Sequence, residues 1–316
     1  MTIGIISYLV FFLSLVMIFG IVTMGLNLQW GYTGLFNAGI AGFYAVGAYT
    51  HAILTTPPLP GFIANQGLPW LVGIAGAMAV TALAAWIIGI ATIKLRGDYL
   101  AISSFGIATT IQLVTLNWEG LTGGSQGMAR IPKPLATIFD TPFSFNLFFL
   151  CLLLVIVIVV YWALERLVHS PWGRVLKAIR EDEIAAVALG KSAQKFRMQA
   201  FILGSTLMGL AGALYVSYIG FVSPFDFLPI VTFQIWAMLI VGGSGNNKGA
   251  LLGALVIWAI WAMSGVAVTK IVPAAYAAQG AAIQVILIGL MLVLSLLFRP
   301  RGLIGEKQVI ARPSDN

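Results

Sequence analysis

Charged residues are scarce in this sequence. Asp, Glu, Lys and Arg make up 9% of the 316 residues, and none of them occurs before Lys94. Soluble domains carry about 25% charged residues, so this chain cannot form an ordinary water-facing surface. The shortage excludes a water-soluble enzyme, a nucleic-acid-binding domain and a disordered protein. The chain is therefore expected to be an integral membrane protein without a nucleic-acid partner.

Residues that bind metals or perform catalysis are scarce as well. Cys151 is the one cysteine and lies in an apolar run, which excludes an intrachain disulfide and favours a small buried side chain. His51 and His169 have no Cys or acidic partner at ligand spacing, so no metal site is expected. No nucleophile elbow, HExxH motif or pair of intramembrane carboxylates occurs. We therefore predict no catalytic residue and no resident cofactor.

Apolar residues are abundant, at 60% of the chain, with a mean hydropathy of +0.99. Repeated apolar runs of about 20 residues are typical of membrane helices rather than of a barrel. We predict an all-α integral membrane protein with one transmembrane domain over residues 1–316 and about eight to ten spans, some of them broken. The expected segments are Ile3–Met24, Thr33–Leu54, Pro69–Ile93, Tyr99–Leu116, Phe145–Leu164, Gln199–Phe221, Pro229–Val241, Gly249–Val268 and Gly280–Phe298. The seventh is short enough to be a half-helix.

The positions of the basic residues predict which loops face the cytoplasm. If the loop at about 165–198 is cytoplasmic and each segment crosses once, 14 of the 17 Lys and Arg residues lie inside. Only Arg130, Lys133 and Lys270 then lie outside. This distribution obeys the positive-inside rule and places the C-terminal tail, at about 299–316, in the cytoplasm. The loops Thr55–Leu68 and Glu119–Ser144 are expected on the outer side.

The charged segment Ser170–Arg197 is expected to bind a partner protein. Ser170-Pro171 is typical of a helix start, Gly190 of a helix end, and Ser192 of the cap of a following helix. The segment therefore predicts an amphipathic helix, a turn, and a second helix that leads into the next span. Its mixed charges favour a cytoplasmic protein partner over anionic lipid. The alternative interpretation is a solvated loop at the membrane surface.

The 35 glycines predict close helix packing and one broken helix. Gly249 and Gly253 form a GxxxG motif, and Gly204 and Gly209 belong to overlapping pairs of small residues. Five glycines fall between Gly31 and Gly47, a density that favours a kinked or broken helix that lines a cavity. The Gly242–Gly249 stretch lacks the spacing of a phosphate-binding loop and is interpreted as a cytoplasmic turn.

Neutral polar residues take the place of charge within the predicted spans. Ion-driven transporters commonly carry ionisable groups there, so their absence argues against ion coupling. A structural subunit without a pathway is disfavoured by the polar residues in the first, second and fourth segments. The candidate pathway residues are Asn37, Ser104, Thr109 and Gln112. Hydrogen bonds that only join helices are the alternative role for each of them.

Several motifs, in one order along nearly the whole chain, resemble LivM-type permease subunits of ABC importers for branched-chain and other hydrophobic amino acids. The motifs are LNLQWGYTGL at 26–35, GAYT at 47–50, LRGDYLAI at 95–102, LTGGSQG at 121–127, GRVLKAIRE at 173–181, AGALY at 211–215, GGSG at 242–245 and PRGL at 300–303. The resemblance implies a transport subunit in the bacterial inner membrane, surrounded by lipid, rather than an enzyme.

The resemblance also implies the partners of such a subunit. They are a second permease related to LivH, two cytoplasmic ATPase subunits that bind the ATP, and a periplasmic or lipid-anchored solute-binding protein. The segment Ser170–Gly190 matches the cytoplasmic coupling segment of the family, which sits in a groove of an ATPase subunit. The residues expected to contribute to coupling are Arg174, Lys177, Ile179, Arg180, Glu181, Ala185 and Gly190.

Two departures from the family pattern leave the solute open. Many members have Gly-His where this chain has Gly39-Ile40. Many also have Glu and, three residues later, Arg in the fourth span, where this chain has Thr109 and Gln112. Both changes remove ionisable groups. A neutral or hydrophobic amino acid is the expected solute; urea, short amides and aromatic acids are the alternatives within related importers. An ion-coupled secondary transporter is the alternative class.

Overall fold

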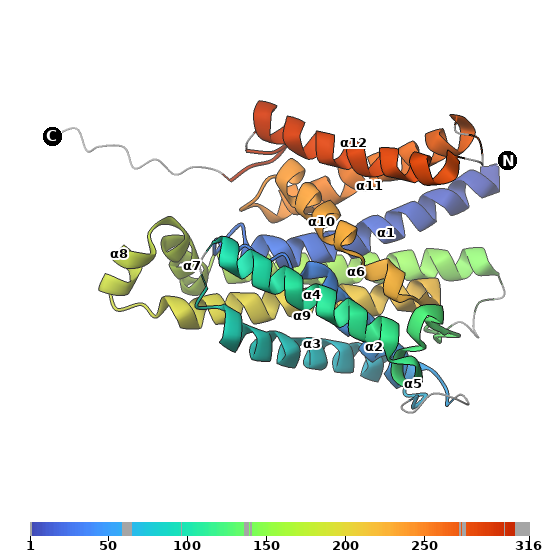
Figure 1. Ribbon diagram of the computed structural model, residues 1–316, viewed down its shortest axis with the longest axis horizontal. Coiled ribbons are helices and arrows are strands. Elements are labelled where there is room, and N and C mark those ends of the chain that lie inside the picture. Colours follow the sequence, from blue (N-terminus) through green and yellow to red (C-terminus); the bar gives the residue numbers. More distant parts are fainter. Residues whose placement is uncertain are drawn as a thin grey trace.

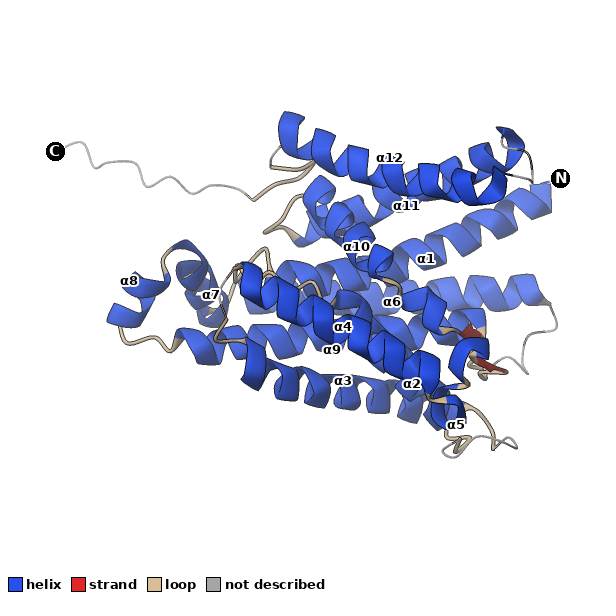
Figure 2. Ribbon diagram, in the orientation of Figure 1, coloured by secondary structure: helices blue, strands red, loops and turns tan. Residues whose placement is uncertain are grey.

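The computed structural model describes residues 2–58, 65–95, 97–135, 139, 141–271, 273, 276–299 and 301–306. Most of these residues are helical (Figure 2). In chain order the elements are α1 (Thr2–Gln29), α2 (Ile40–Thr55), α3 (Trp70–Thr92), α4 (Asp98–Asn117), α5 (Glu119–Thr122), η1 (Gly124–Gln126), β1 (Met128–Ala129), α6 (Pro142–Val168), α7 (Pro171–Glu181), α8 (Glu183–Ala188), α9 (Ala193–Ile219), β2 (Phe221–Val222), η3 (Pro224–Phe227), α10 (Pro229–Gly242), α11 (Asn247–Ile271) and α12 (Ala277–Phe298).

Each of the nine predicted segments corresponds to one helix of a lengthwise bundle (Figure 1). Within the residues that the structure describes, six of these helices are long and apolar enough to cross a membrane, namely α1, α3, α4, α6, α9 and α11. The predicted half-helix is α10, whose 14 residues extend about 21 Å at 1.5 Å per residue. The chain is therefore a multi-pass α-helical membrane protein.

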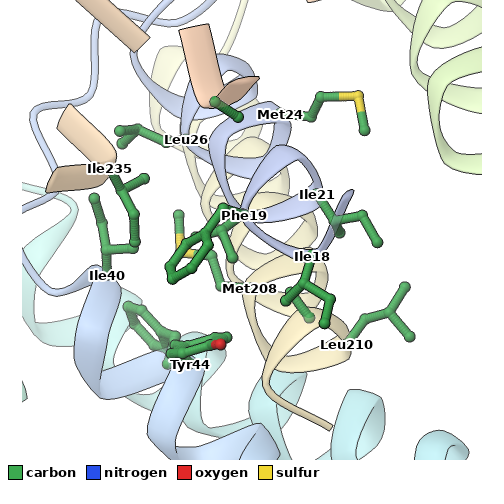
Figure 3. Packing of buried hydrophobic residues seen from close by; sticks show 14 of the residues in the cluster. Ile18, Phe19, Ile21, Met24, Leu26, Ile40, Tyr44, Met208, Leu210 and Ile235 are labelled. Atoms are coloured by element: carbon green, nitrogen blue, oxygen red, sulfur yellow. The ribbon is translucent and has the colours of Figure 1, made fainter. Parts of the chain in front are cut away.

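The core of the bundle lies where α1, α2, α9 and α10 meet. Ile18, Phe19 and Ile21 of α1 contribute to one buried cluster with Tyr44 of α2 and Met208 of α9 (Figure 3). Ile235 of α10 belongs to the same cluster. Lipid tails are as apolar as these side chains, so tight packing rather than water exclusion must hold the helices together.

Small residues let the helices approach closely, as the sequence predicts. A Cβ atom on Gly204 of α9 would lie 2.6 Å from the carbonyl oxygen of Gly25 in α1. A Cβ atom on Gly253 of α11 would lie within 2.8 Å of the Gly242 backbone in α10. Real Cβ atoms do not make such contacts, so these positions require glycine. The GxxxG and small-residue motifs are confirmed as packing elements.

A break separates α1 from α2 and covers only the first part of the glycine-rich stretch for which a kinked or broken helix is predicted, since Gly42 and Gly47 lie within the continuous helix α2. α1 ends at Gln29, residues 30–39 are not α-helical, and α2 begins at Ile40. Gly34 adopts a φ of +74°, a left-handed conformation that glycine accepts without steric cost. Most of the break is buried or partly buried between other helices, although Gly34 is exposed, and irregular backbone in a membrane protein requires such shielding from lipid.

The two ends of the bundle differ. One end, here the α7 end, holds α7, α8, the turn between α10 and α11, and residues 301–306 (Figure 1). The opposite end, here the β1–β2 end, holds α5, η1 and an antiparallel pair in which Met128 faces Val222 and Ala129 faces Phe221 (Figure 2). The loops that the basic residues predict on one side of the membrane therefore lie together at one end of the bundle, and those predicted on the other side lie at the opposite end. Arg96, Lys307 and Arg312, three of the residues expected inside, lie outside the described residues.

The segment after α6 has the predicted helix boundaries and one additional break. α7 begins at Pro171 after Ser170, and α9 begins after Ser192, although neither serine side chain caps its helix. The expected single helix up to Gly190 is split at Asp182, which is extended. The Asp182 carboxylate accepts a hydrogen bond of 3.0 Å from the Ala185 amide and starts α8.

Candidate translocation pathway and coupling surface

Asn37 lies in the α1–α2 break, three residues before α2 begins, and is fixed there by hydrogen bonds. Its Nδ2 donates to Gln29 Oε1 over 2.8 Å, its Oδ1 accepts from the Gly39 amide over 2.7 Å, and its carbonyl oxygen accepts from Trp236 Nε1 over 3.1 Å. The side chain is fully buried. Asn37 thus joins the end of α1 to the start of α2 and to α10.

Gln29 extends the same network to α9. Its Nε2 donates to the Phe201 carbonyl oxygen over 2.8 Å and lies 3.1 Å from Ser205 Oγ. Because its Oε1 accepts from Asn37, both ends of the Gln29 amide are satisfied inside the bundle. The break is therefore a polar junction of α1, α2, α9 and α10.

Ser104 ties α4 to this junction. Its Oγ accepts from the Ala38 amide over 2.9 Å and donates to the Ala101 carbonyl oxygen over 3.0 Å. Only 1% of Ser104 is exposed. In this conformation, the side chains of Asn37 and Ser104 form their hydrogen bonds with other groups of the protein. Contact with a solute requires the junction to open, and their assignment to the pathway stays a prediction.

Thr109 and Gln112 lie further along α4 and are only partly buried. Thr109 Oγ1 donates to the Gly106 carbonyl oxygen of its own helix over 2.8 Å, which leaves the side chain independent of the junction. Thr109 lines a shallow hollow between α2, α4 and α10. The structure therefore separates the four candidates into a buried pair at the break and an accessible pair on α4.

A cavity of about 310 Å³ lies between α2 and the C-terminal half of α4, towards the β1–β2 end. Its surface is almost entirely apolar and is formed by aliphatic, aromatic and threonine side chains, including Tyr49, Thr50, Ile53, Thr110, Val114 and Trp118. Sequence reasoning did not identify this cavity, because its lining comes from α2, α4 and α5, whose facing sides are set only by the fold. A neutral lining of this kind suits an uncharged side chain better than an ion.

The predicted coupling residues divide into an exposed set and an internal set. Arg174, Glu181, Ala185 and Gly190 are exposed on α7, α8 and the following turn. Lys177 and Arg180 are partly buried and pair with Glu306, which follows α12. The exposed set is free to meet a partner at the α7 end, whereas the internal set contacts the chain itself.

Ile179 requires a correction. The sequence places it on an apolar stripe expected to dock against an ATPase subunit, but only 2% of it is exposed. Ile179 packs with Ala186 and Ala193, so the stripe fills the space between α7, α8 and α9. The apolar side chains that remain open are Ile184, Val187 and Leu189, at 76%, 52% and 80% exposure. These three residues form the exposed apolar patch of α8 and of Leu189 directly after it.

Glu306 is held as an anion by its neighbours. Burial by itself would raise the pKa of the Glu306 carboxyl, but hydrogen bonds and positive charge from Lys177 and Arg180 outweigh this and hold the pKa below its usual value. The sequence carries no local signal for this contact, since Glu306 lies more than 120 positions from both partners.

Long apolar helices, a buried neutral break and a short helical pair at one end together define a multi-pass membrane permease. The family described as "Branched-chain amino acid transport system / permease component" matches residues 8–296, and the chain belongs to this family. The expectation of a LivM-type permease of an ABC importer is thereby confirmed.

Relatives with established names agree with this assignment. The high-affinity branched-chain amino acid transport system permease protein LivM of Escherichia coli is 32% identical over 92% of this chain and 68% of that protein. The "Probable branched-chain amino acid transport permease protein LivM" of Methanocaldococcus jannaschii is 28% identical over 99% of this chain and 97% of that protein. The LivH permease of Escherichia coli is 23% identical over 92% of each chain. No solved structure matches the chain.

Proposed function

We propose that the chain forms half of the membrane pathway of an ATP-driven importer that carries branched-chain amino acids into a bacterial cell. The observation that carries this proposal is the similarity to LivM proteins along nearly the whole chain, including the segment that contains α7 and α8. The other half of the pathway is a LivH-like permease. The similarity of this chain to LivH proteins supports a pair of related subunits.

The neutral interior supports an uncharged side chain on the solute. Hydroxyl and amide groups at Ser104, Thr109 and Gln112 can replace water around a zwitterion without binding it tightly, which suits a release pathway. The cavity between α2 and α4 offers aliphatic and threonine surface at the end where a solute-binding protein would dock. Branched aliphatic side chains fit this chemistry better than the charge of an aromatic acid.

Energy enters at the opposite end in this proposal. The α7 end faces the cytoplasm, in agreement with the positive-inside distribution, and the C-terminal tail lies there too. Two separate ATPase subunits bind and hydrolyse the ATP, and one of them docks on the exposed surface of α7 and α8. The permease itself holds no cofactor and performs no chemistry on the solute.

Reconstitution tests this function and its alternatives together. The chain, its partner permease and the two ATPases are placed in proteoliposomes with the cognate binding protein, and uptake of leucine, isoleucine, valine, urea, acetamide and benzoate is measured. ATP-dependent uptake of the three amino acids is expected. Uptake of urea, acetamide or benzoate without the amino acids would assign another solute. Uptake driven by a proton gradient through the permease alone would contradict ATP coupling.

A further inference from the structure

Arg180 of α7 lies directly on the turn that follows α1. One of its guanidinium nitrogens donates to the carbonyl oxygen of Gly31, 149 positions earlier in the chain. Its Cγ would lie 3.3 Å from a Cβ atom on Gly34. Because Gly34 has no side chain, the Arg180 side chain has room to lie across the start of the break. A displacement of α7 towards the Gly31–Gly34 turn must therefore press the Arg180 side chain against this turn.

Glu306 fixes Arg180 and its neighbour Lys177 from the other side. Glu306 Oε2 accepts from Arg180 Nη2 over 2.7 Å, and Oε1 accepts from Lys177 Nζ over 2.5 Å. The Lys177 ammonium also lies 5.5 Å from the ring centroid of Tyr32. The Glu306 side chain is 25% exposed, so these charge-assisted bonds are less screened than a surface ion pair.

The backbone before Glu306 is attached to α10. The Leu303 amide donates to the Val241 carbonyl oxygen and the Ile304 amide to the Gly242 carbonyl oxygen, each over 2.9 Å. A Cβ atom on Gly245, in the turn after α10, would lie 2.8 Å from Glu306 Oε2. Glu306 is thus carried by the end of α10 rather than by a free tail.

The turn that Arg180 contacts leads directly into the polar junction. Beyond Gly34, the Asn37 carbonyl oxygen accepts from Trp236 of α10, and the Ala38 amide donates to Ser104 of α4. Arg180 is therefore connected to α4 and α10 by its hydrogen bond to Gly31, by the backbone from Gly31 to Ala38, and by the hydrogen bonds of Asn37 and Ala38. Such a contiguous network is the physical requirement for coupling between two distant sites, and measured coupling is its proof.

We propose that Glu306, Arg180 and Lys177 form a link that transmits the movement of α7 to the α1–α2 break, so that Glu306 sets how much solute is moved for each ATP hydrolysed. The proposal rests on the proposed function. Glu306 is a positioning residue: it holds Arg180 against the Gly31–Gly34 turn and contacts neither solute nor ATPase. Without this carboxylate, α7 can still bind the ATPase subunit and move with it, but the α1–α2 break no longer moves together with α7.

The ratio of solute transported to ATP hydrolysed tests the link. Both rates are measured on the same reconstituted importer, normalised to the amount of assembled complex, for the wild type and Glu306→Gln. The expected result is an ATP hydrolysis rate close to that of the wild type and a ratio lowered roughly tenfold. Glu119→Gln, which removes a carboxylate at the β1–β2 end, is the matched control and is expected to keep the wild-type ratio.

Exchanging the charges of Lys177 and Glu306 distinguishes a link between α7 and the break from a role of Glu306 in stability alone. Lys177→Glu and Glu306→Lys each place like charges together and are expected to lower the ratio. In the double variant, the carboxylate at position 177 pairs with the ammonium at position 306 and lies one helical turn from Arg180, so that one anion again lies between two cations and much of the ratio is expected to return. This comparison also holds if Glu306→Gln assembles poorly, because recovery is scored against the two single variants.

The outcomes are distinguishable. An unchanged ratio in Glu306→Gln overturns the link, and so does a fall of transport and hydrolysis in equal proportion in assembled complexes. A double variant no better than the single variants overturns it as well. If the wild-type importer hydrolyses ATP but moves none of the solutes, the proposed function fails and the link fails with it; in every other case the wild type transports and the link is judged alone.

Discussion

Gly47 of α2 and Gly209 of α9 touch backbone to backbone: a Cβ atom on Gly47 would lie 2.1 Å from the Gly209 carbonyl oxygen. Both residues are buried midway along their helices. Since α2 begins at the break, this contact sets the position of the polar junction relative to the core of the bundle. Neither helix can accept a side chain here without moving.

Gly47→Ala is expected to lower the free energy of unfolding by roughly 1–3 kcal/mol, the usual range for overpacking. Thermal unfolding of the purified protein in detergent measures the effect. Gly106→Ala is the matched control, because Gly106 also lies within a helix but has no atom within 4 Å of its added Cβ. Ala has the higher helix propensity by about 1 kcal/mol, so this control should be neutral or slightly stabilising. Equal destabilisation by both variants would contradict the packing argument.

The fold could be predicted from this sequence because a membrane imposes simple rules on it. The length of each apolar run located the corresponding long helix, and the glycines between Gly31 and Gly47 pointed to the region of the break. Pairing between helices could not be predicted in the same way. The contact of Gly47 with Gly209 and that of Gly25 with Gly204 depend on which helix faces lie together, and local sequence does not encode this choice.

The α8 surface is expected to bind an ATPase subunit through its apolar patch. Ile184→Asp places a charge where an interface would remove it from water, and an unpaired buried charge is costly. We expect binding at least about tenfold weaker, a loss of about 1.4 kcal/mol. Co-purification of the ATPases with tagged permease measures it. Leu135→Asp, at an exposed apolar position near the β1–β2 end, should leave co-purification normal.

Ile179→Asp separates docking from folding at the same segment. Because Ile179 is enclosed by α7, α8 and α9, this variant should loosen the two short helices and expose the segment to trypsin, whereas Ile184→Asp should stay resistant. If Ile184→Asp were cleaved as readily as Ile179→Asp, or retained its ATPases, the patch on α8 would not be the docking surface.

The ion pairs of Glu306 predict a specific pH dependence. The pKa of Glu306 is lower in the folded chain than its usual value, so the anion stabilises the fold at pH values above the unfolded pKa of about 4.3. This contribution should disappear as the pH falls through the lower, folded-state pKa. The difference in stability between the wild type and Glu306→Gln, measured by thermal unfolding from pH 7 to pH 3, should be constant down to about pH 5 and then shrink. A difference that grows on acidification would contradict the assigned pairing.

The candidate site was only partly predictable. Neutral polar residues in apolar segments pointed to Asn37 and Ser104, and the structure unites both at one junction. Their hydrogen bonds to Gln29 and to the Ala38 amide could not be foreseen, because each depends on how the break folds. The inward orientation of Ile179 was missed since an amphipathic helix shows the same periodicity whether its apolar side faces its own chain or a partner. Nothing in the sequence around Glu306 indicated its contacts with Lys177 and Arg180.

The accessibility of Thr109 to water tests the central claim most directly, namely that this chain lines a solute pathway driven by separate ATPases. Thr109→Cys and Asn37→Cys are made with Cys151→Ala, and a small water-soluble thiol reagent is applied to the assembled importer at rest and during ATP hydrolysis. Val155→Cys, on the exposed side of α6, is the lipid-facing control. We predict that Thr109→Cys reacts at rest, that Asn37→Cys reacts only during hydrolysis, and that the control stays unlabelled. Labelling of Thr109→Cys and Asn37→Cys no faster than the control in both conditions would contradict the account.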